Sequence, residues 1–126
     1  MSIKYKVIEK GNPLNPQEPR KWYASTKSTG GTDIKALGKE IAQRSTVSPA
    51  DTQAVLVALT EVLSEHLSEG QIVRLDDFGS FQISAGSEGA ETEAKFNVSM
   101  IRNPKVVFRP GTELKTMLNN LKFEKL

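Results

Sequence analysis

The residue types in this sequence that could carry chemistry are mainly basic. The chain has 126 residues, with 17 Lys and Arg against 15 Asp and Glu, and a formal net charge of +2. Residues 1–27 hold six bases and two acids, and residues 102–126 also hold six bases and two acids, whereas the segment between them is acidic. Basic charge gathered near the two ends of a chain favours a polyanionic partner such as a nucleic acid.

The basic residues that could contact phosphate form two groups. The C-terminal group consists of Arg102, Lys105, Arg109 and Lys115. The N-terminal group consists of Lys4, Lys6, Lys10, Arg20, Lys21 and Lys27. Lys and Arg neutralise phosphate charge, and such contacts position a duplex without reading its bases. The alternative is a solvated strand face, or, for the N-terminal group, lysines that protect an edge strand. The sequence leaves both interpretations open.

Residues suited to catalysis or metal binding are scarce. Asp76 and Asp77 are adjacent acids at a chain reversal, where such residues usually form local caps. His66 is the single histidine and the chain has no cysteine, so neither a zinc site nor a disulfide is expected. The sequence has no glycine-rich phosphate loop ending in Lys-Ser/Thr and no nucleophile elbow. We expect a protein that is not an enzyme and uses no metal, cofactor or small-molecule substrate.

No segment is suited to a membrane. The first ten residues lack the apolar stretch of a signal peptide. The longest apolar run, residues 54–59, is far shorter than the roughly 20 residues that span a bilayer. The sequence therefore predicts a soluble cytoplasmic protein with no membrane partner.

The N-terminal elements that carry basic residues are predicted to be strands. Residues 2–9 alternate apolar and polar side chains, which is typical of a half-buried strand. Residues 10–19 contain three prolines and predict a loop, after which residues 20–28 predict a second strand that pairs with the first. Trp22 and Tyr23 are expected to pack in a core rather than stack on bases.

Two helices are predicted next. Residues 32–45 place Gly38 on an apolar stripe, with Thr32 as the expected N-cap. The second helix, residues 48–70, begins with Ser48 as its cap.

This second helix is apolar on every side over residues 54–59, which include Val57. A helix that is apolar all round must be buried all round, and so small a chain has few elements to surround it. We infer that a second subunit does so, in a homodimer.

The C-terminal half is predicted to be mostly strand. Residues 73–84 begin and end like strands and reverse at Asp-Asp-Phe-Gly. Residues 85–94 are small and acidic, and predict a flexible segment. Residues 95–101 resume the alternation of a strand, and a short strand at 105–109 leads into a helix over residues 112–121.

Two motifs carry a resemblance to a known family. "VRLDDFGSF" at residues 73–81 and "VVFRPGTELKTML" at residues 106–118 resemble the HU/IHF family of bacterial histone-like DNA-binding proteins. With the two helices, the resemblance covers roughly residues 30–121. The extra segment 1–29 and the acidic "SEGAETEA" resemble the extended subfamily named HU-HIG.

The resemblance implies an α+β fold with a helical base, a β-saddle and a β-arm at about residues 82–101, intertwined as a dimer. Residues 1–29 would form an added N-terminal β-hairpin, and residues 30–126 the HU-like domain. The implied dimer core contains Val57, Phe78, Phe81 and Phe108.

The implied function is architectural: a nucleoid-associated homodimer that binds and condenses double-stranded DNA without sequence specificity. One departure concerns the arm. Its tip, expected near residues 86–93, is acidic and lacks proline, and Arg102-Asn103-Pro104 is expected at the arm's base. Kinking of DNA by an inserted proline is therefore not expected. The alternative is a module of the same fold that has lost DNA binding and whose acidic arm meets a basic protein.

Overall fold

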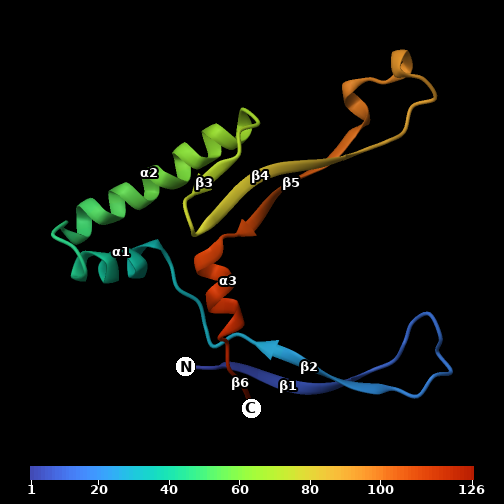
Figure 1. Cartoon of the computed structure of the whole chain (residues 1–126), viewed down its shortest axis with the longest axis horizontal. Helices are drawn as coiled ribbons and strands as arrows, with labels where there is room; N and C mark the ends of the chain where they lie inside the picture. Colours follow the sequence, from blue (N-terminus) through green and yellow to red (C-terminus); the bar gives the residue numbers. More distant parts are fainter. The chain divides into compact units, whose positions relative to one another are not determined.

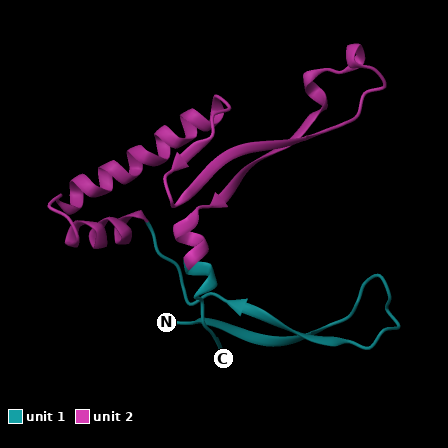
Figure 2. Ribbon diagram, in the orientation of Figure 1, with its two compact units in different colours: residues 1–33, 117–126 teal, residues 34–116 magenta.

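The computed structural model describes all 126 residues and divides them into two compact units (Figure 2). Unit 1 consists of Met1–Asp33 and Met117–Leu126, and unit 2 of Ile34–Thr116. The domain boundary after residue 29 stays a prediction. The grouping of the last ten residues with the first 33 is a feature that the sequence did not suggest.

Unit 1 is built on a three-stranded sheet of order β2-β1-β6 (Figure 1). β1 (Ile3–Lys10) and β2 (Lys21–Lys27) pair antiparallel, as the alternation of residue types predicts. β6 (Phe123–Lys125) adds to the other side of β1 in parallel orientation. Three residues are too few to show a period, so this strand was not predicted.

Two helices open unit 2. α1 (Ile34–Gln43) begins at Ile34, so Asp33 and not the predicted Thr32 precedes its first residue. α2 (Pro49–Ser68) is capped as predicted, because the Ser48 hydroxyl accepts a hydrogen bond from the Asp51 N–H at 3.1 Å. Gly38 is buried where the two helices meet.

The second sheet has the order β3-β4-β5, and all its pairs are antiparallel. Its strands are β3 (Val73–Leu75), β4 (Gly79–Ser87) and β5 (Ile101–Pro110). The predicted reversal lies between β3 and β4, where the Phe78 N–H donates to the Leu75 carbonyl at 2.9 Å and Asp76 takes a φ of 45°. Asp tolerates this left-handed conformation better than most residues.

The same turn holds the start of α3 (Thr112–Asn119). The Gly111 N–H donates to the Phe78 carbonyl at 2.9 Å, and the Glu113 N–H donates to the Asp77 carbonyl at 3.0 Å. The turn's free carbonyls therefore serve as acceptors for the backbone that follows β5.

Gly79 is required by the way the strands meet. A Cβ on Gly79 would lie 2.6 Å from both the Arg109 carbonyl oxygen and the Phe108 ring, and its φ of 155° is one that other residues rarely adopt. The glycine in Asp-Asp-Phe-Gly lets the Arg109 carbonyl and the Phe108 ring pack directly against the start of β4.

β4 and β5 form a long two-stranded ribbon, the arm, which extends away from α2 (Figure 1). The predicted strand at residues 95–101 is wrong: 3₁₀ turns occupy Glu93–Lys95 and Val98–Met100. The side chains of Thr92 and Asn97 accept hydrogen bonds from the N–H groups of Lys95 and Ser99. This local capping competes with strand pairing, so β5 begins only at Ile101.

Apolar side chains gather in unit 2 without being enclosed. The Phe108 ring lies 4.8 Å from the Phe81 ring and 5.8 Å from the Phe78 ring, centre to centre. Phe78 is nevertheless 42% exposed and Val57 41% exposed. No large apolar side chain of the single chain is fully buried.

Candidate nucleic-acid interface

The β3-β4-β5 sheet of unit 2 has two chemically different faces. Residues paired directly across antiparallel strands lie on the same face, so register decides which side chains share a face. The apolar face carries Val73, Phe81, Phe108, Ile83 and Val106. Phe81, Ile83 and Val106 line one groove with α2 residues, so the apolar face lies toward that helix. The other face is therefore turned away from α2.

This second face is basic. Its cations are Arg74 on β3, and Arg102, Lys105 and Arg109 on β5. The β4 residues between them are Ser80, Gln82, Ser84 and Gly86, and none of these strand positions holds a carboxylate. We call Arg74, Arg102, Lys105 and Arg109 the saddle cations.

The saddle cations follow the length of the sheet. Arg74 and Arg109 both pair with Ser80, one from each side, so their backbones lie about 10 Å apart. Lys105 precedes Arg109 by four residues on β5, so their backbones lie about 13 Å apart. All four side chains are exposed. This arrangement presents a row of positive charge, which matches a partner that carries a row of negative charge.

Arg74 was missed by sequence reasoning. A signal was available, because in Val-Arg-Leu the arginine alternates with two apolar residues and so points away from the core. What the sequence does not show is the pairing of Arg74 and Arg109 with the same residue of β4.

The position of Arg102 corrects a prediction. The arm's base is the pair Gly79 and Pro110, and its far end is the pair Ser87 and Ile101. Arg102-Asn103-Pro104 therefore lies near the far end of the ribbon, not at its base. The prediction was wrong because it assumed a return strand before residue 101.

A bulge accommodates the Asn-Pro step. Asn103 and Pro104 together face Ala85, because Ser84 pairs with Lys105 and Gly86 pairs with Arg102. Asn103 takes a φ of 53°, and Pro104 has no N–H to leave unpaired. Pro104 thus lies in a bulge within β5 and not in the connecting loop.

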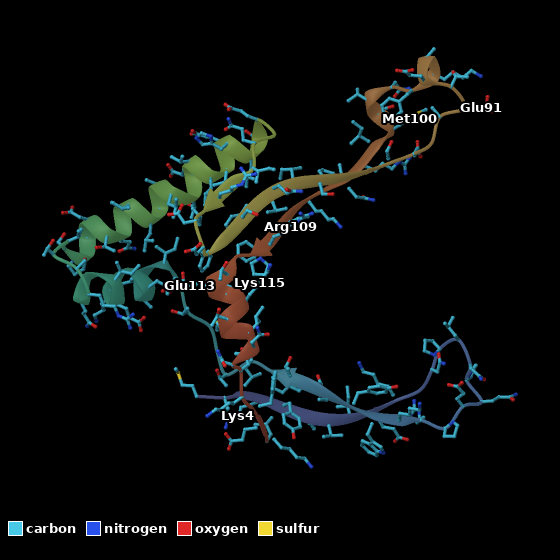
Figure 3. The ribbon with its side chains drawn as sticks, viewed as in Figure 1. Lys4, Glu91, Met100, Arg109, Glu113 and Lys115 are labelled. Atoms are coloured by element: carbon cyan, nitrogen blue, oxygen red, sulfur yellow. The ribbon has the colours of Figure 1, made fainter.

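The tip of the arm comprises residues 88–100, a longer segment than the predicted 86–93. Figure 3 shows Glu91 and Met100 here, at the opposite end of the arm from Arg109. The Glu88 carboxylate forms an ion pair with the Arg102 guanidinium, and Glu91 pairs with Lys95 at 3.0 Å. The acidic tip therefore neutralises one of the saddle cations.

Lys115 lies on α3, two residues after Glu113, and is exposed (Figure 3). It is not part of the sheet that carries the saddle cations. His66, at the end of α2, has its Nδ1 2.5 Å from the Gln71 amide oxygen. The Phe78 and Phe81 rings both lie close to the Phe108 ring, and their place in a dimer core stays a prediction.

In unit 1, the predicted basic residues lie mostly on the strands. Lys4 and Lys6 are on β1, Lys21 and Lys27 are on β2, and Arg20 immediately precedes β2. Lys4 Nζ lies 2.5 Å from Glu124 Oε2. Hydrogen bonds from Lys4 and from the Ser2 hydroxyl hold the pKa of the exposed Glu124 below its usual range.

Trp22 and Tyr23 do not pack in a core, which corrects the sequence-based expectation. Trp22 is 65% exposed and Tyr23 47% exposed, and unit 1 itself contains only one sheet. None of the helices combines the length and the hydrophobicity needed to span a membrane.

Comparison with known proteins gives one family. The family model described as "HU domain fused to wHTH, Ig, or Glycine-rich motif" (HU-HIG) matches residues 1–125. DNA-binding protein HU from Clostridium pasteurianum is 31% identical over 81 residues, which cover 63% of this chain and 89% of that protein. Integration host factor subunit alpha from Vibrio cholerae is 26% identical over 91 residues, covering 71% and 93%.

Two solved structures share the fold. A putative bacterial DNA binding protein from Bacteroides vulgatus aligns with a TM-score of 0.67 at 13% identity over 99% of this chain, which spans 48% of that longer chain. HU from Anabaena, in a cocrystal with DNA, aligns with a TM-score of 0.52 at 21% identity, over 71% of this chain and 99% of that one.

Proposed function

Because this chain belongs to the HU-HIG group of the HU/IHF family of DNA-binding architectural proteins, we propose that it binds double-stranded DNA without reading its sequence. The observation that carries the proposal is the basic face of the β3-β4-β5 sheet. Arg74, Lys105 and Arg109 extend from it with no acid at any strand position of that face. An uncompensated row of cations matches the phosphate backbone of a duplex.

Sequence independence follows from the kind of contact. Lys and Arg on an open strand face reach phosphates by charge, whereas base reading requires side chains inserted in a groove with fixed hydrogen-bond geometry. The saddle cations lie on β-strands, and the tip that could enter a groove carries three glutamates. The face therefore supplies affinity and little discrimination between sequences.

We also propose that the working form is a homodimer. α2 exposes Val55, Val57, Leu59 and Val62, each by 41% or more. An open apolar groove of about 690 Å³ lies between α2 and β3, lined by residues that include Leu59, Val62 and Val73. A second copy would cover these surfaces together with the exposed Phe78 and Phe108. It would also double the number of saddle cations offered to one duplex.

In this proposal the protein acts on the bacterial nucleoid, in the cytoplasm, as a DNA-condensing component and not as an enzyme. The rival function, a protein-interaction module that uses the acidic arm, is less well supported. Two of the three tip glutamates, Glu88 and Glu91, are already engaged by cations of the same arm.

The test is a fluorescence-anisotropy titration of the protein with a short duplex over a range of salt concentrations. Each phosphate contact contributes about 0.9 to the slope of log affinity against log salt. Arg109→Ala should flatten that slope by about 1.8 in a dimer, and equally for unrelated sequences. Lys35→Ala on α1 removes one positive charge from a different element and should leave the slope unchanged. Absence of duplex binding by the wild type at low salt would contradict the proposal and favour a protein partner.

A further inference from the structure

Unit 1 carries a second basic surface, formed by one face of the β2-β1-β6 sheet. The register of β1 and β2 pairs Lys4 with Lys27, Lys6 with Ser25, Ile8 with Tyr23, and Lys10 with Lys21. These pairs share one face because directly opposed residues lie on the same side of a sheet. The other face carries Ile3, Tyr5, Val7, Trp22 and Phe123 and is mostly apolar. We call the first the lysine face.

The lysine face contains almost no compensating acid. Among its strand positions the one carboxylate is Glu124, which pairs with Lys4. Glu9 is opposite Trp22 and therefore lies on the apolar face. Lys6, Lys10, Lys21 and Lys27 have no ion pair in the structure.

The register also places like charges directly opposite one another. Lys10 faces Lys21 at one end of the hairpin and Lys4 faces Lys27 at the other. Such pairs destabilise a sheet, because the side chains of opposed residues begin about 5 Å apart. A sheet that served only as a scaffold would gain from exchanging one member of each pair for an acid.

Edge protection explains only part of this pattern. Lysines guard against aggregation when they stand on an unpaired edge strand. β6 pairs with β1 over Ile3–Tyr5 alone, so Lys6 and Lys10 border an open edge, as do Lys21 and Lys27 on β2. Lysines on either face would protect such an edge, but all the lysines of β1 and β2 share one face.

The spacing of the face fits a polyanion. Alternate residues of a strand are about 6.7 Å apart, and the phosphates of one DNA strand advance about 3.4 Å each along the duplex axis. The spacing of alternate lysines is therefore of the same order as the spacing of phosphates along a duplex. The face from Lys4 to Lys10 is about 20 Å long, or roughly six base pairs.

At the hairpin end the face closes into a pocket of about 310 Å³. Lys10, Lys21 and Tyr23 line it together with residues of the connecting loop. Its one carboxylate, Glu18, accepts a hydrogen bond from the Asn12 amide at 3.1 Å. Lys10, Lys21 and Tyr23 thus border one hollow that a phosphate group could enter.

We propose that the lysine face of unit 1 is a second duplex-binding surface, separate from the saddle cations, with Lys6, Lys10, Lys21 and Lys27 as its phosphate contacts. The choice of DNA over other polyanions rests on the function proposed above. A membrane of anionic lipid would also attract lysines, and it is treated as a competing outcome of the test.

The experiment compares charge-matched double variants of the full chain. Lys10→Gln/Lys21→Gln removes two charges from the lysine face, and Lys35→Gln/Lys39→Gln removes two from α1. Duplex binding is followed by anisotropy against salt, and folding by thermal denaturation. The first variant should flatten the slope by about 1.8 for each chain bound. Its melting temperature should stay equal or rise, because a like-charge pair is removed.

The outcomes separate this inference from the function proposed above. If Arg109→Ala flattens the slope but Lys10→Gln/Lys21→Gln does not, the lysine face is not a DNA surface and the saddle remains one. If only the lysine-face variant is defective, the inference holds and the saddle proposal fails. Lys6→Gln/Lys27→Gln serves as a second variant should the first fold poorly.

Two further results would overturn the inference. One is an α1 control that flattens the slope as much as the lysine-face variant, because net charge alone would then explain the effect. The other is wild-type binding to vesicles containing phosphatidylglycerol that the lysine-face variant loses while its slope on DNA is unchanged.

Discussion

The junction of turn, strand and arm depends directly on Gly79. A methyl group there would lie 2.6 Å from a backbone oxygen and an aromatic ring, and the φ of 155° adds strain. We expect Gly79→Ala to destabilise the protein on the order of 3 kcal/mol. Gly89→Ala in the arm tip is the matched control, because nothing lies within 4 Å of its added Cβ. Chemical denaturation checks both; equal midpoints would contradict this account of Gly79.

The Glu88–Arg102 ion pair leads to a prediction about affinity. The pair is exposed, so its contribution to stability is about 1 kcal/mol or less. Its effect on DNA binding is larger, because Arg102 is occupied by a carboxylate instead of a phosphate. Glu88→Gln should therefore tighten duplex binding and steepen the salt slope by up to about 0.9 per chain. Glu93→Gln removes the same charge from the tip without altering Arg102. If the two variants tighten binding equally, the pair has no specific role.

These two cases show which features of a site can be predicted from single residues of a sequence and which cannot. The Phe-Gly-x-Phe and Phe-Arg-Pro-Gly motifs indicate the family. The guanidinium group of Arg109 indicates that this residue is suited to contact phosphate. The partner of Arg102 depends on the register between β4 and β5, which a bulge shifts. A one-residue change in register alters every cross-strand neighbour, and no single residue type predicts that change.

The arm shows how local structure can override strand propensity. The pattern of residues 95–101 favours a strand, yet Thr92 and Asn97 cap 3₁₀ turns there. The tip, residues 88–100, is consequently joined to the β4–β5 ladder by little more than the Glu88–Arg102 ion pair and the bond from the Glu88 N–H to the Met100 carbonyl at 2.9 Å. Val98, 79% exposed, shows how little apolar surface the tip buries.

We therefore expect the tip to be dispensable. Replacing residues 89–99 with a short Gly-Ser turn keeps Glu88 and the whole β4–β5 ladder. The free energy of unfolding should change by less than about 0.5 kcal/mol, because few contacts are lost. Duplex affinity should not fall, since the removed segment carries two glutamates and one lysine. Loss of binding on this deletion would make the acidic tip a contact surface.

The division of the chain into units was beyond sequence reasoning for a similar reason. The last ten residues join the first 33 through a three-residue strand parallel to β1. The two-faced character of the unit 1 sheet likewise depends on which residues of β1 and β2 are opposed. Lysine counts alone could not separate a binding face from a solvated one.

The complete molecule is expected to be an obligate dimer, because a single chain leaves its apolar surface uncovered. Val55 is 64% exposed on α2, and Phe78 and Phe108 are 42% and 37% exposed on the turn and β5. Soluble monomers rarely expose such contiguous apolar surface. Val57→Asp would place an unpaired charge in the covered region, at a cost of several kcal/mol. We expect this variant to be unfolded or monomeric. Because it no longer dimerises, it should also lose duplex binding.

The matched control for this prediction is Val98→Asp, the same substitution at the exposed arm tip, which should remain a folded dimer. Light scattering and circular dichroism at micromolar concentration distinguish the cases. The wild type and Val98→Asp should have the mass of two chains, and Val57→Asp should not. A wild type with the mass of one chain and a cooperative thermal transition would contradict the dimer. The exposed side chains of α2 would then be surface for a different partner, and the saddle cations would act from a single sheet.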